Sequence, residues 1–325
     1  MRIVTGIRPI GELHIGNYLN TVKQYVELQE KNECIFFIAD LHGVTTPYQP
    51  KDYQKEIIKK TIDILATGLN PEKCIVYIQS KIKEIPELAL LLSTVTPVGD
   101  LSRMTQFKEK SKKHPQYVNA GLLNYPILMA ADILIYQADL VPVGKDQQQH
   151  LELARTIARK FNNQFGETFK EPKALILKSS AKIMSLQEPK RKMSKSDFSS
   201  TRINIFDEPE ELRKKIMVAV TDTGKKINYS PLTKPGISNL LTIYSLFSDK
   251  PIKEIEKKFK GKGYAYFKKQ LANLLIEKFE PFRRKRKELL AREVYVKEIL
   301  EQGFKRAEVL AETTMEEVRK KMGLV

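Results

Sequence analysis

The sequence has few cysteines, no tryptophan and no long apolar run, and these shortages exclude several classes of protein. Cys34 and Cys74 are the only cysteines in 325 residues, too few and too far apart for a disulfide framework or a zinc ribbon. The best candidate for a membrane span, residues 122–136, is interrupted by an asparagine, a proline and an aspartate and stays below the required ~18 residues. The first 16 residues contain Arg2, Arg8 and Glu12 and lack an apolar secretory segment. We therefore expect a cytoplasmic protein with no membrane partner.

Charge is abundant and unevenly distributed. The chain has 56 Lys and Arg against 39 Asp and Glu, a formal net charge of +17. Residues 1–187 hold 24 basic and 19 acidic side chains, whereas residues 188–325 hold 32 and 20. This excess indicates that the C-terminal part contacts a polyanion such as nucleic acid. Solvated, lysine-rich helix faces of a thermophilic or compositionally biased protein explain the charge equally well.

Apolar runs alternate with helical patterns over the first half of the chain. Short apolar runs predict buried strands at residues 3–5, 34–39, 74–78 and 140–143. Apolar residues three and four apart predict helices at residues 15–26, 53–65 and 146–161. This alternation predicts an α/β fold, a Rossmann-like doubly wound parallel sheet with helices on both faces.

From about residue 205 the strand patterns give way to helices. Helical segments are predicted at residues 208–220, 237–247, 252–259 and 264–279, followed by a basic stretch beyond Pro281. A chain of this length holds about two domains. We place the boundary near residue 187, so that residues 1–187 form the sheet domain and residues 188–325 a C-terminal helical domain.

A glycine-rich turn joins the first predicted strand to the first predicted helix. Residues 6–17 have the sequence GIRPIGELHIGN, and a doubly wound fold has its ligand crevice at such a junction. Unpaired backbone N–H groups at the helix start favour a phosphate chain. Gly16 lets a flat base approach the helix backbone, while His14 and Asn17 add hydrogen-bond donors. Glycine-rich turns before helices are common, so a purely structural role of His14 stays open.

A second pattern, KMSKS at residues 192–196, lies in the polar boundary segment. Two lysines three positions apart, with hydroxyl groups between them, suit a cationic clamp on a transferring phosphoryl group. In isolation such a pentapeptide is more often a solvated basic loop or a phosphorylation site.

Together the two patterns resemble the two signatures of the class I aminoacyl-tRNA synthetases, and the chain is most similar to bacterial tryptophanyl-tRNA synthetases. Further matching segments lie at residues 103–110 (RMTQFKEK), 120–123, 129–134 (MAADIL), 141–147 (VPVGKDQ) and 234–241 (KPGISNLL). The resemblance implies a tryptophan–tRNA ligase that forms tryptophanyl-adenylate and pyrophosphate from ATP. It then transfers tryptophan to the 3′ adenosine of tRNA(Trp).

The resemblance also implies which residues hold the nucleotide. ATP is assigned to both signatures, to the loop after the fourth strand and to one residue before the second signature: Arg8, Pro9, Ile10, His14, Gly16, Asn17, Gly144, Lys145, Asp146, Ile183, Lys192, Met193, Ser194, Lys195 and Ser196. Lys110, Lys192 and Lys195 are the implied catalytic residues and hold the pyrophosphate leaving group. Mg²⁺ is expected on the ATP phosphates, without a dedicated carboxylate site in the protein, because magnesium binds readily through substrate oxygens.

Asp132 is a carboxylate within an otherwise apolar helical pattern. It shares a face with Tyr125, Met129 and Tyr136, and a buried carboxylate needs hydrogen bonds from the protein or from a ligand. In the resembled family this position accepts the indole N–H of tryptophan, which has one donor and a large apolar face. The resemblance implies a tryptophan site with Tyr125 and Gln147 on the α-amino group: Asp132, Tyr125, Met129, Gln147, His42, Val143 and Val4. Plain core packing stays an alternative for the apolar members and for Tyr125.

Four positions depart from the common pattern of the resembled family. Arg8 stands in place of glutamine, Val4 of phenylalanine, His14 of threonine and Lys145 of glutamate. Because Arg8 adds a cation beside the triphosphate, we expect tighter ATP binding or an altered response to inhibitors. Val4 leaves the tightness of the indole pocket open.

The family further implies a homodimer whose tRNA spans both subunits. Its C-terminal helices would read the anticodon, with residues 283–287 (RRKRK) on phosphates or simply solvated. A tyrosine enzyme would need a pair of groups that recognises a phenol rather than the single acceptor Asp132. A paralogue that binds RNA or senses tryptophan without charging tRNA would not need both intact KMSKS lysines, and a small-molecule adenylyltransferase would not need the basic tail. The bases read on the tRNA and the dimer surface are not indicated.

Overall fold

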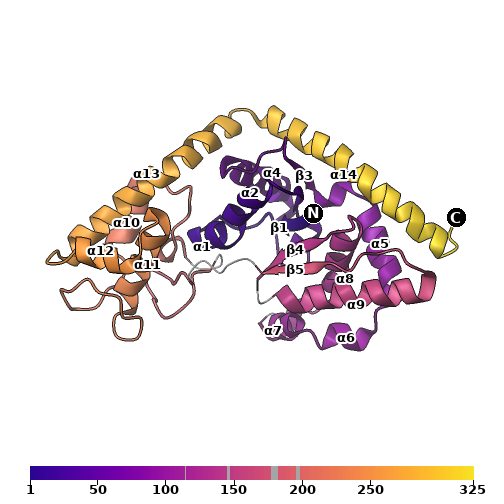
Figure 1. Cartoon of the computed structure of the whole chain (residues 1–325), viewed down its shortest axis with the longest axis horizontal. Coiled ribbons are helices and arrows are strands. Elements are labelled where there is room, and N and C mark those ends of the chain that lie inside the picture. Colours follow the sequence, from indigo (N-terminus) through magenta and orange to yellow (C-terminus); the bar gives the residue numbers. More distant parts are fainter. Residues whose placement is uncertain (114, 145–146, 177–181, 195–197) are drawn as a thin grey trace. The chain divides into compact units, whose positions relative to one another are not determined.

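The computed structural model describes residues 1–113, 115–144, 147–176, 182–194 and 198–325 (Figure 1). The chain forms two compact units. The sheet unit comprises Met1–Ile10, Tyr25–Leu177 and Leu289–Val325, and the helical unit comprises Gly11–Gln24 and Lys178–Glu288. The units therefore interleave along the chain and do not follow the boundary expected at residue 187. The end of the chain belongs to the sheet unit, and residues 11–17 of the first signature belong to the helical unit.

The sheet has five parallel strands in the order β3-β2-β1-β4-β5. The strands are β1 (Arg2–Ile7), β2 (Glu33–Ile38), β3 (Cys74–Ile78), β4 (Leu140–Val143) and β5 (Lys173–Ile176). All five residues of β3 and the last five of β2 are buried, as expected for strands covered on both faces. The predicted α/β fold and its four strands are confirmed. β5 was not predicted, because its three apolar residues follow a lysine and are mostly exposed.

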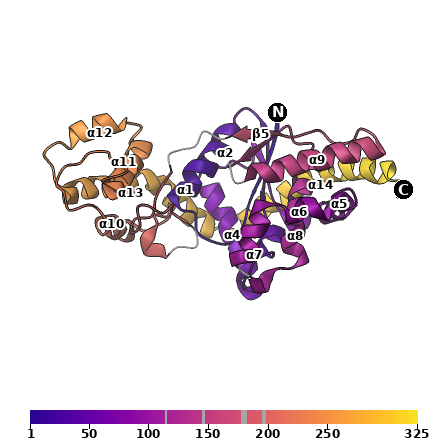
Figure 2. The same cartoon turned by 90° about the horizontal axis from the view of Figure 1, so that it is seen from below.

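Helices of the sheet unit surround these strands. They are α3 (Asp40–Gly43), α4 (Pro50–Ala66), α5 (Glu84–Ser93), α6 (Val98–Ser102), α7 (Thr105–Lys113), α8 (Ala120–Leu134), α9 (Gln148–Phe165) and α14 (Glu293–Lys321), with short 3₁₀ turns at η2 (Gln79–Lys81) and η3 (Pro115–Tyr117). α8 packs against both α5 and α9 (Figures 1 and 2). Pro50 begins α4, where its missing N–H costs nothing. The predicted helices at residues 53–65 and 146–161 are confirmed, although α9 begins at Gln148.

α14 packs against β3, the strand at one end of the sheet order. Gly303 makes this approach possible, because a Cβ atom there would lie 1.9 Å from the carbonyl oxygen of Val76. Near its end, Arg319 donates from Nε and Nη2 to the Glu87 carboxylate of α5, at 2.8 and 2.5 Å. The last helix is thus fastened to the unit that contains the first strand.

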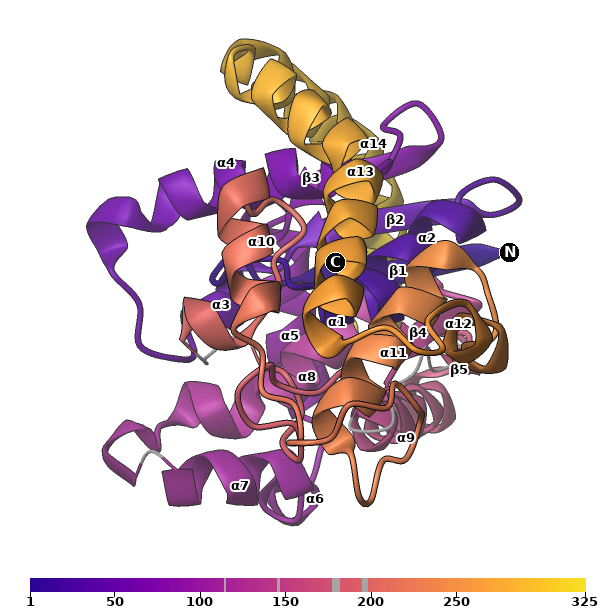
Figure 3. The same ribbon diagram turned by 90° about the vertical axis from the view of Figure 1, so that its left-hand side faces the viewer.

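The helical unit contains the α-helices α1 (Ile15–Asn17), α10 (Pro209–Met217), α11 (Pro235–Ser248) and α12 (Ile252–Lys258), most of α13 (Tyr264–Leu290), a 3₁₀ turn at η5 (Ser199–Thr201) and a π-helical segment, η1 (Tyr18–Val22). α11 and α12 lie side by side (Figure 3). The single helix predicted over residues 15–26 is instead α1, η1 and α2 (Lys23–Leu28) in succession. α13 continues through Pro281 rather than ending there. None of the described helices is long and apolar enough to cross a membrane.

Candidate active site

Asp132 lies on α8 in the hydrophobic interior of the sheet unit. Only 1% of its surface is exposed, and both of its carboxylate oxygens have protein partners. His42 Nε2 lies 2.7 Å from Oδ2, and Gln79 Nε2 donates to Oδ1 at 2.7 Å. Burial raises the pKa of Asp132, while the hydrogen bonds from His42 and Gln79 oppose this rise. Since a carboxylate has about four acceptor positions, these two bonds leave acceptor capacity on the group.

Tyr125 is one of the two predicted contacts of the substrate α-amino group, and its hydroxyl lies 2.8 Å from His150 Nε2. His150 is fully buried on α9, so Tyr125 is held by a neighbouring helix. The His42 and Tyr125 rings form an edge contact with centroids 6.4 Å apart. Tyr125 therefore lies in the same cluster as His42 and Asp132. Burial raises the pKa of Tyr125 to about 12, which keeps its hydroxyl neutral at physiological pH.

Lys110, a predicted catalytic residue, lies on α7 with its ammonium over the Tyr125 ring. Nζ is 4.2 Å from the ring centroid, within the range of a cation–π contact. Burial, followed by the positive charge of Arg8, lowers the pKa of Lys110 to about 8. The structure thus brings together three predicted site residues, Arg8, Lys110 and Tyr125, although more than a hundred positions separate the first from the other two.

The apolar residues assigned to tryptophan are all in the sheet unit. Val4 and Val143 belong to its hydrophobic core, and Met129 packs against that core. Core packing accounts for their burial, and their contact with a substrate stays a prediction. Gln147 lies immediately before α9, where its N–H donates to the Gly144 carbonyl oxygen at 3.0 Å.

Residues 14–17 of the first signature lie in the helical unit and form the start of α1. His14 is the N-cap, with Nδ1 accepting from the N–H of Gly16 at 3.1 Å. The neutral ring therefore carries its proton on Nε2. A Cβ atom at Gly16 would lie 2.9 Å from the His14 ring, so the missing side chain makes room for the imidazole. The Oδ1 atom of Asn17 has no partner among the residues described.

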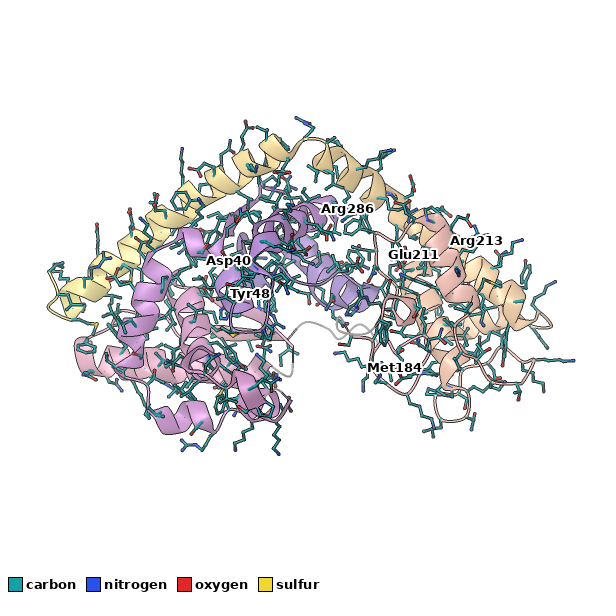
Figure 4. All side chains as sticks on the ribbon, turned by 180° about the vertical axis from the view of Figure 1, so that it is seen from behind. Asp40, Tyr48, Met184, Glu211, Arg213 and Arg286 are labelled. Carbon is teal, nitrogen blue, oxygen red and sulfur yellow. The ribbon has the colours of Figure 1, made fainter. Side chains whose placement is uncertain are left out.

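Within the helical unit, residues 183–194 pair with one another, and residues 203–205 pair with residues 13–15. Met193 N–H donates to Ile183 O at 3.1 Å, and Ile15 N–H donates to Ile203 O at 2.9 Å. Isolated bridges pair Met184 with Lys192 and His14 with Asn204. Met184, labelled in Figure 4, therefore belongs to the same unit as the start of α1. Ile183 and Met193 are buried, and Lys192 is exposed.

Of the remaining residues predicted to bind ATP, some are described by the structure and others are not. Arg8 and Ile10 are exposed, Pro9 is buried and Gly144 is exposed, all in the sheet unit. Ser194 is partly buried in the helical unit. Lys145, Asp146, Lys195 and Ser196 lie outside the described residues.

Sequence reasoning missed three polar residues that hold the predicted site together. Asp40 lies two residues after β2, Gln79 follows directly on β3, and His150 lies on α9 beside Tyr125. The signal for the first two was available, because polar residues at the carboxyl ends of parallel strands lie where such folds bind ligands. His150 had no comparable signal, since a histidine on an amphipathic helix is ordinarily just a core residue.

Two of the basic side chains of α13 that we expected on tRNA phosphates, Arg283 and Arg286, already contact other groups of the protein. Arg283 donates to the Ile276 carbonyl oxygen at 2.6 Å and pairs with Glu280. The Arg286 guanidinium lies over the Phe206 ring, 4.8 Å from its centroid. Arg284, Lys285 and Lys287 are exposed.

Comparison with known proteins gives one consistent family. A family model described as class I tRNA synthetases (W and Y) matches residues 1–280. The tryptophan–tRNA ligase of Caldanaerobacter subterraneus subsp. tengcongensis is 47% identical over 325 residues, covering 100% of this chain and 98% of the relative. That of Helicobacter pylori (strain J99) is 45% identical over 328 residues, covering 100% and 99%.

Solved structures agree with these sequence relatives. The tryptophanyl-tRNA synthetase of Campylobacter jejuni, crystallised with ADP and tryptophan, matches with a TM-score of 0.89 and 37% identity, covering 99% of this chain and 100% of the other. The Mycoplasma pneumoniae enzyme matches with a TM-score of 0.86 and 35% identity, covering 100% and 98%. Since the fold, both signatures and the full-length relatives agree, the chain belongs to the class I aminoacyl-tRNA synthetases, in the family of the bacterial tryptophanyl-tRNA synthetases.

Proposed function

We propose that this enzyme activates L-tryptophan with ATP and transfers it to the 3′ adenosine of tRNA(Trp). The observation that carries the proposal is Asp132, a buried carboxylate with acceptor capacity left in the apolar interior of the sheet unit. An indole offers one N–H donor and otherwise apolar surface, so a single acceptor in such surroundings matches it. A phenol requires a partner for a hydroxyl that both donates and accepts.

The tryptophan subsite consists of Asp132 for the indole N–H and Tyr125 and Gln147 for the α-amino group. Met129, Val143 and Val4 surround the ring, and His42 lines the pocket beside Asp132. Support comes from the geometry of Asp132, His42 and Tyr125, which belong to one cluster. The assignment of the apolar members rests on the family resemblance.

In the first half-reaction an oxygen of the tryptophan carboxylate attacks the α-phosphorus of ATP. The bond from the α-phosphorus to the bridging oxygen breaks, and pyrophosphate leaves as tryptophanyl-adenylate forms. No general base is needed, because the nucleophile is already ionised; positioning and charge stabilisation do the work. Lys110, Lys192 and Lys195 are proposed to stabilise the departing pyrophosphate, and Mg²⁺ would neutralise charge on the phosphates.

Residues of both signatures are proposed to bind the remainder of ATP. The side chains of His14 and Asn17 are proposed to contact the nucleotide. The backbone N–H groups of residues 15 and 16 are already engaged, by Ile203 O and by His14 Nδ1. Arg8, Pro9, Ile10, Gly16, Gly144, Ile183, Met193 and Ser194 complete the described members. Lys145, Asp146 and Ser196 are retained as predictions.

In the second half-reaction a ribose hydroxyl of the terminal adenosine attacks the activated carbonyl carbon. An ester forms, and AMP leaves. The net charge of +17 favours binding of tRNA, and the exposed basic residues of α13 are proposed phosphate contacts. As in the family, the working assembly is proposed to be a homodimer.

The proposal is tested by ATP–pyrophosphate exchange with tryptophan or tyrosine. The chain contains no tryptophan, so indole fluorescence of added tryptophan reports binding directly. We expect exchange with tryptophan alone, and an Asp132→Asn variant with tryptophan kcat/KM reduced by about one to two orders of magnitude. Exchange that does not depend on tryptophan would refute the proposed function.

A further inference from the structure

Gln79 is a fully buried glutamine with both ends of its side-chain amide engaged. Its Nε2 donates to Asp132 Oδ1 at 2.7 Å, and its Oε1 accepts from the N–H of Leu41 at 3.1 Å. A backbone N–H can only donate, so Oε1 must face Leu41 and Nε2 must face Asp132. The orientation of the amide is therefore set by the protein before any ligand binds.

Asp40 links the two segments whose side chains bind Asp132, α3 and η2. Its Oδ1 accepts from the N–H of Leu41 at 3.0 Å and from the N–H of Ser80 at 2.9 Å. One carboxylate thus ties the start of α3, which carries His42, to η2, which carries Gln79. Tyr53 adds a hydrogen bond to the Asp40 carbonyl oxygen at 2.5 Å. Figure 4 labels Asp40 and Tyr48, both in the sheet unit, and the Tyr48 ring packs on that of Tyr53.

The two hydrogen-bond partners of Asp132, His42 and Gln79, differ in their exposure. His42 approaches from α3 and remains 14% exposed at its side chain, so it borders the proposed substrate pocket. Gln79 is 0% exposed and contacts Asp132 from the interior. A ligand can therefore contact His42, whereas Gln79 acts only through Asp132.

We propose that Gln79 is a positioning residue for tryptophan specificity, which fixes the Asp132 carboxylate in the orientation that accepts the indole N–H. This inference rests on the proposed function, since it assigns a supporting role within the same site. By occupying one position on Oδ1, Gln79 prevents the carboxylate from rotating and directs its remaining acceptor positions toward the pocket. Without Gln79, Asp132 would keep its His42 contact but lose its second point of attachment.

The ionisation of Asp132 depends on the same contacts. Among the described residues, the titratable groups facing it are His42 of α3, Asp40 at the start of α3, Tyr77 of β3 and Tyr136, two residues after α8. Burial raises the pKa of Asp132, and the hydrogen bonds of His42 and Gln79 lower it. Loss of the Gln79 donor consequently favours the protonated acid, which is a poorer acceptor for the indole.

The test is a Gln79→Met variant of the full chain. This substitution keeps the length of the side chain and removes both hydrogen bonds of its amide group, to Asp132 and to Leu41. ATP–pyrophosphate exchange is measured with tryptophan and with β-(3-benzothienyl)alanine, in which sulfur replaces the indole N–H. We expect tryptophan kcat/KM to fall about tenfold, with the thiophene analogue almost unaffected, so that preference for tryptophan drops by a similar factor. An unchanged preference, including an equal loss for both substrates, would overturn the inference.

Gln29→Met is the matched control, because Gln29 is another buried glutamine of the sheet unit held at both ends. It donates to the Gly68 carbonyl oxygen at 3.0 Å and accepts from the N–H of Asn70 at 2.9 Å. It should lose comparable stability and keep the wild-type preference. If the wild-type chain itself fails to use tryptophan, the proposed function fails; if wild type succeeds and the Gln79→Met preference is normal, only the role of Gln79 fails.

A second variant, Gln79→Glu, replaces Gln79→Met should the latter not fold. The introduced carboxyl can still accept from Leu41, but it donates to Asp132 only when protonated. We therefore expect a reduced preference for tryptophan at about pH 8 that recovers toward about pH 6, as the two carboxyl groups come to share a proton. A wild-type preference at both pH values would overturn the inference.

Discussion

Activation of tryptophan should become less efficient above pH 8, because Lys110 loses its charge there. Burial and the neighbouring charge of Arg8 lower the pKa of Lys110 to about 8. About half of the molecules then carry a charged Lys110 at pH 8 and about one in ten at pH 9. If this charge stabilises the departing pyrophosphate, kcat/KM for ATP should fall by up to ~tenfold for each pH unit above 8.

Arg8→Gln provides a directional test of this reasoning. Because the positive charge of Arg8 lowers the pKa of Lys110, the variant should raise that pKa and move the alkaline decline to higher pH. The same change removes a cation from the proposed nucleotide site, so the KM for ATP should rise severalfold near neutral pH. The two effects have opposite signs at alkaline pH, which distinguishes them from a general loss of activity.

The assay is ATP–pyrophosphate exchange at saturating tryptophan, with ATP varied between about pH 6.5 and pH 10. Lys110→Met is the reference, since any alkaline decline that remains in it comes from the ammonium group of tryptophan or from another residue. An identical decline in wild type, Arg8→Gln and Lys110→Met would refute the assignment to Lys110. An unchanged KM for ATP in Arg8→Gln would refute the contribution of Arg8 to ATP binding.

Three further predictions concern stability and burial. Gly303→Ala should lower the free energy of unfolding by about 1–3 kcal/mol, because the new Cβ would lie 1.9 Å from a β3 carbonyl oxygen; Gly263→Ala, with no atom within 4 Å, is the control in urea denaturation. Arg319→Met should cost roughly 0.5–1 kcal/mol at neutral pH. Arg319 lowers the pKa of Glu87. The stabilisation of the folded state by this ion pair is therefore present above the ordinary carboxyl pKa and is lost as pH falls through the lowered pKa of Glu87. A difference in unfolding free energy between wild type and Arg319→Met that persists in strong acid would contradict the assignment. The two buried cysteines should resist a thiol reagent at about pH 8 until urea unfolds the chain, since burial raises the pKa of Cys34 to about 11; prompt reaction of the native protein would contradict this burial.

The sheet and most helices could be predicted because their signals are local and repeated. An apolar run such as residues 74–78 identifies a buried strand wherever it falls in the chain. β5 carries only a weak form of that signal. The division of the first helix into α1, η1 and α2 has no periodic signature, because all three segments place apolar residues on similar faces.

The residue types of the site could be predicted from the sequence, but the hydrogen bonds between its residues could not. The carboxylate at position 132 stands out against its apolar neighbours, and the two signatures identify the family. The partners of Asp132 come from α3 and from the end of β3, and no local pattern pairs residues 53 or 90 positions apart. The return of α14 to the sheet was missed for the same reason, since packing between chain ends leaves no periodic mark on the sequence.

The attachment of α14 to β3 also has a consequence for biosynthesis. β3 is complete once residue 78 has left the ribosome, but the helix that covers it ends at residue 321. During translation of the intervening chain, an outer strand of the nascent sheet lacks its cover and is open to pairing with other polypeptides. Premature termination within the last thirty or so codons would therefore leave the strand order intact and expose this flank, so truncated products should aggregate or be degraded.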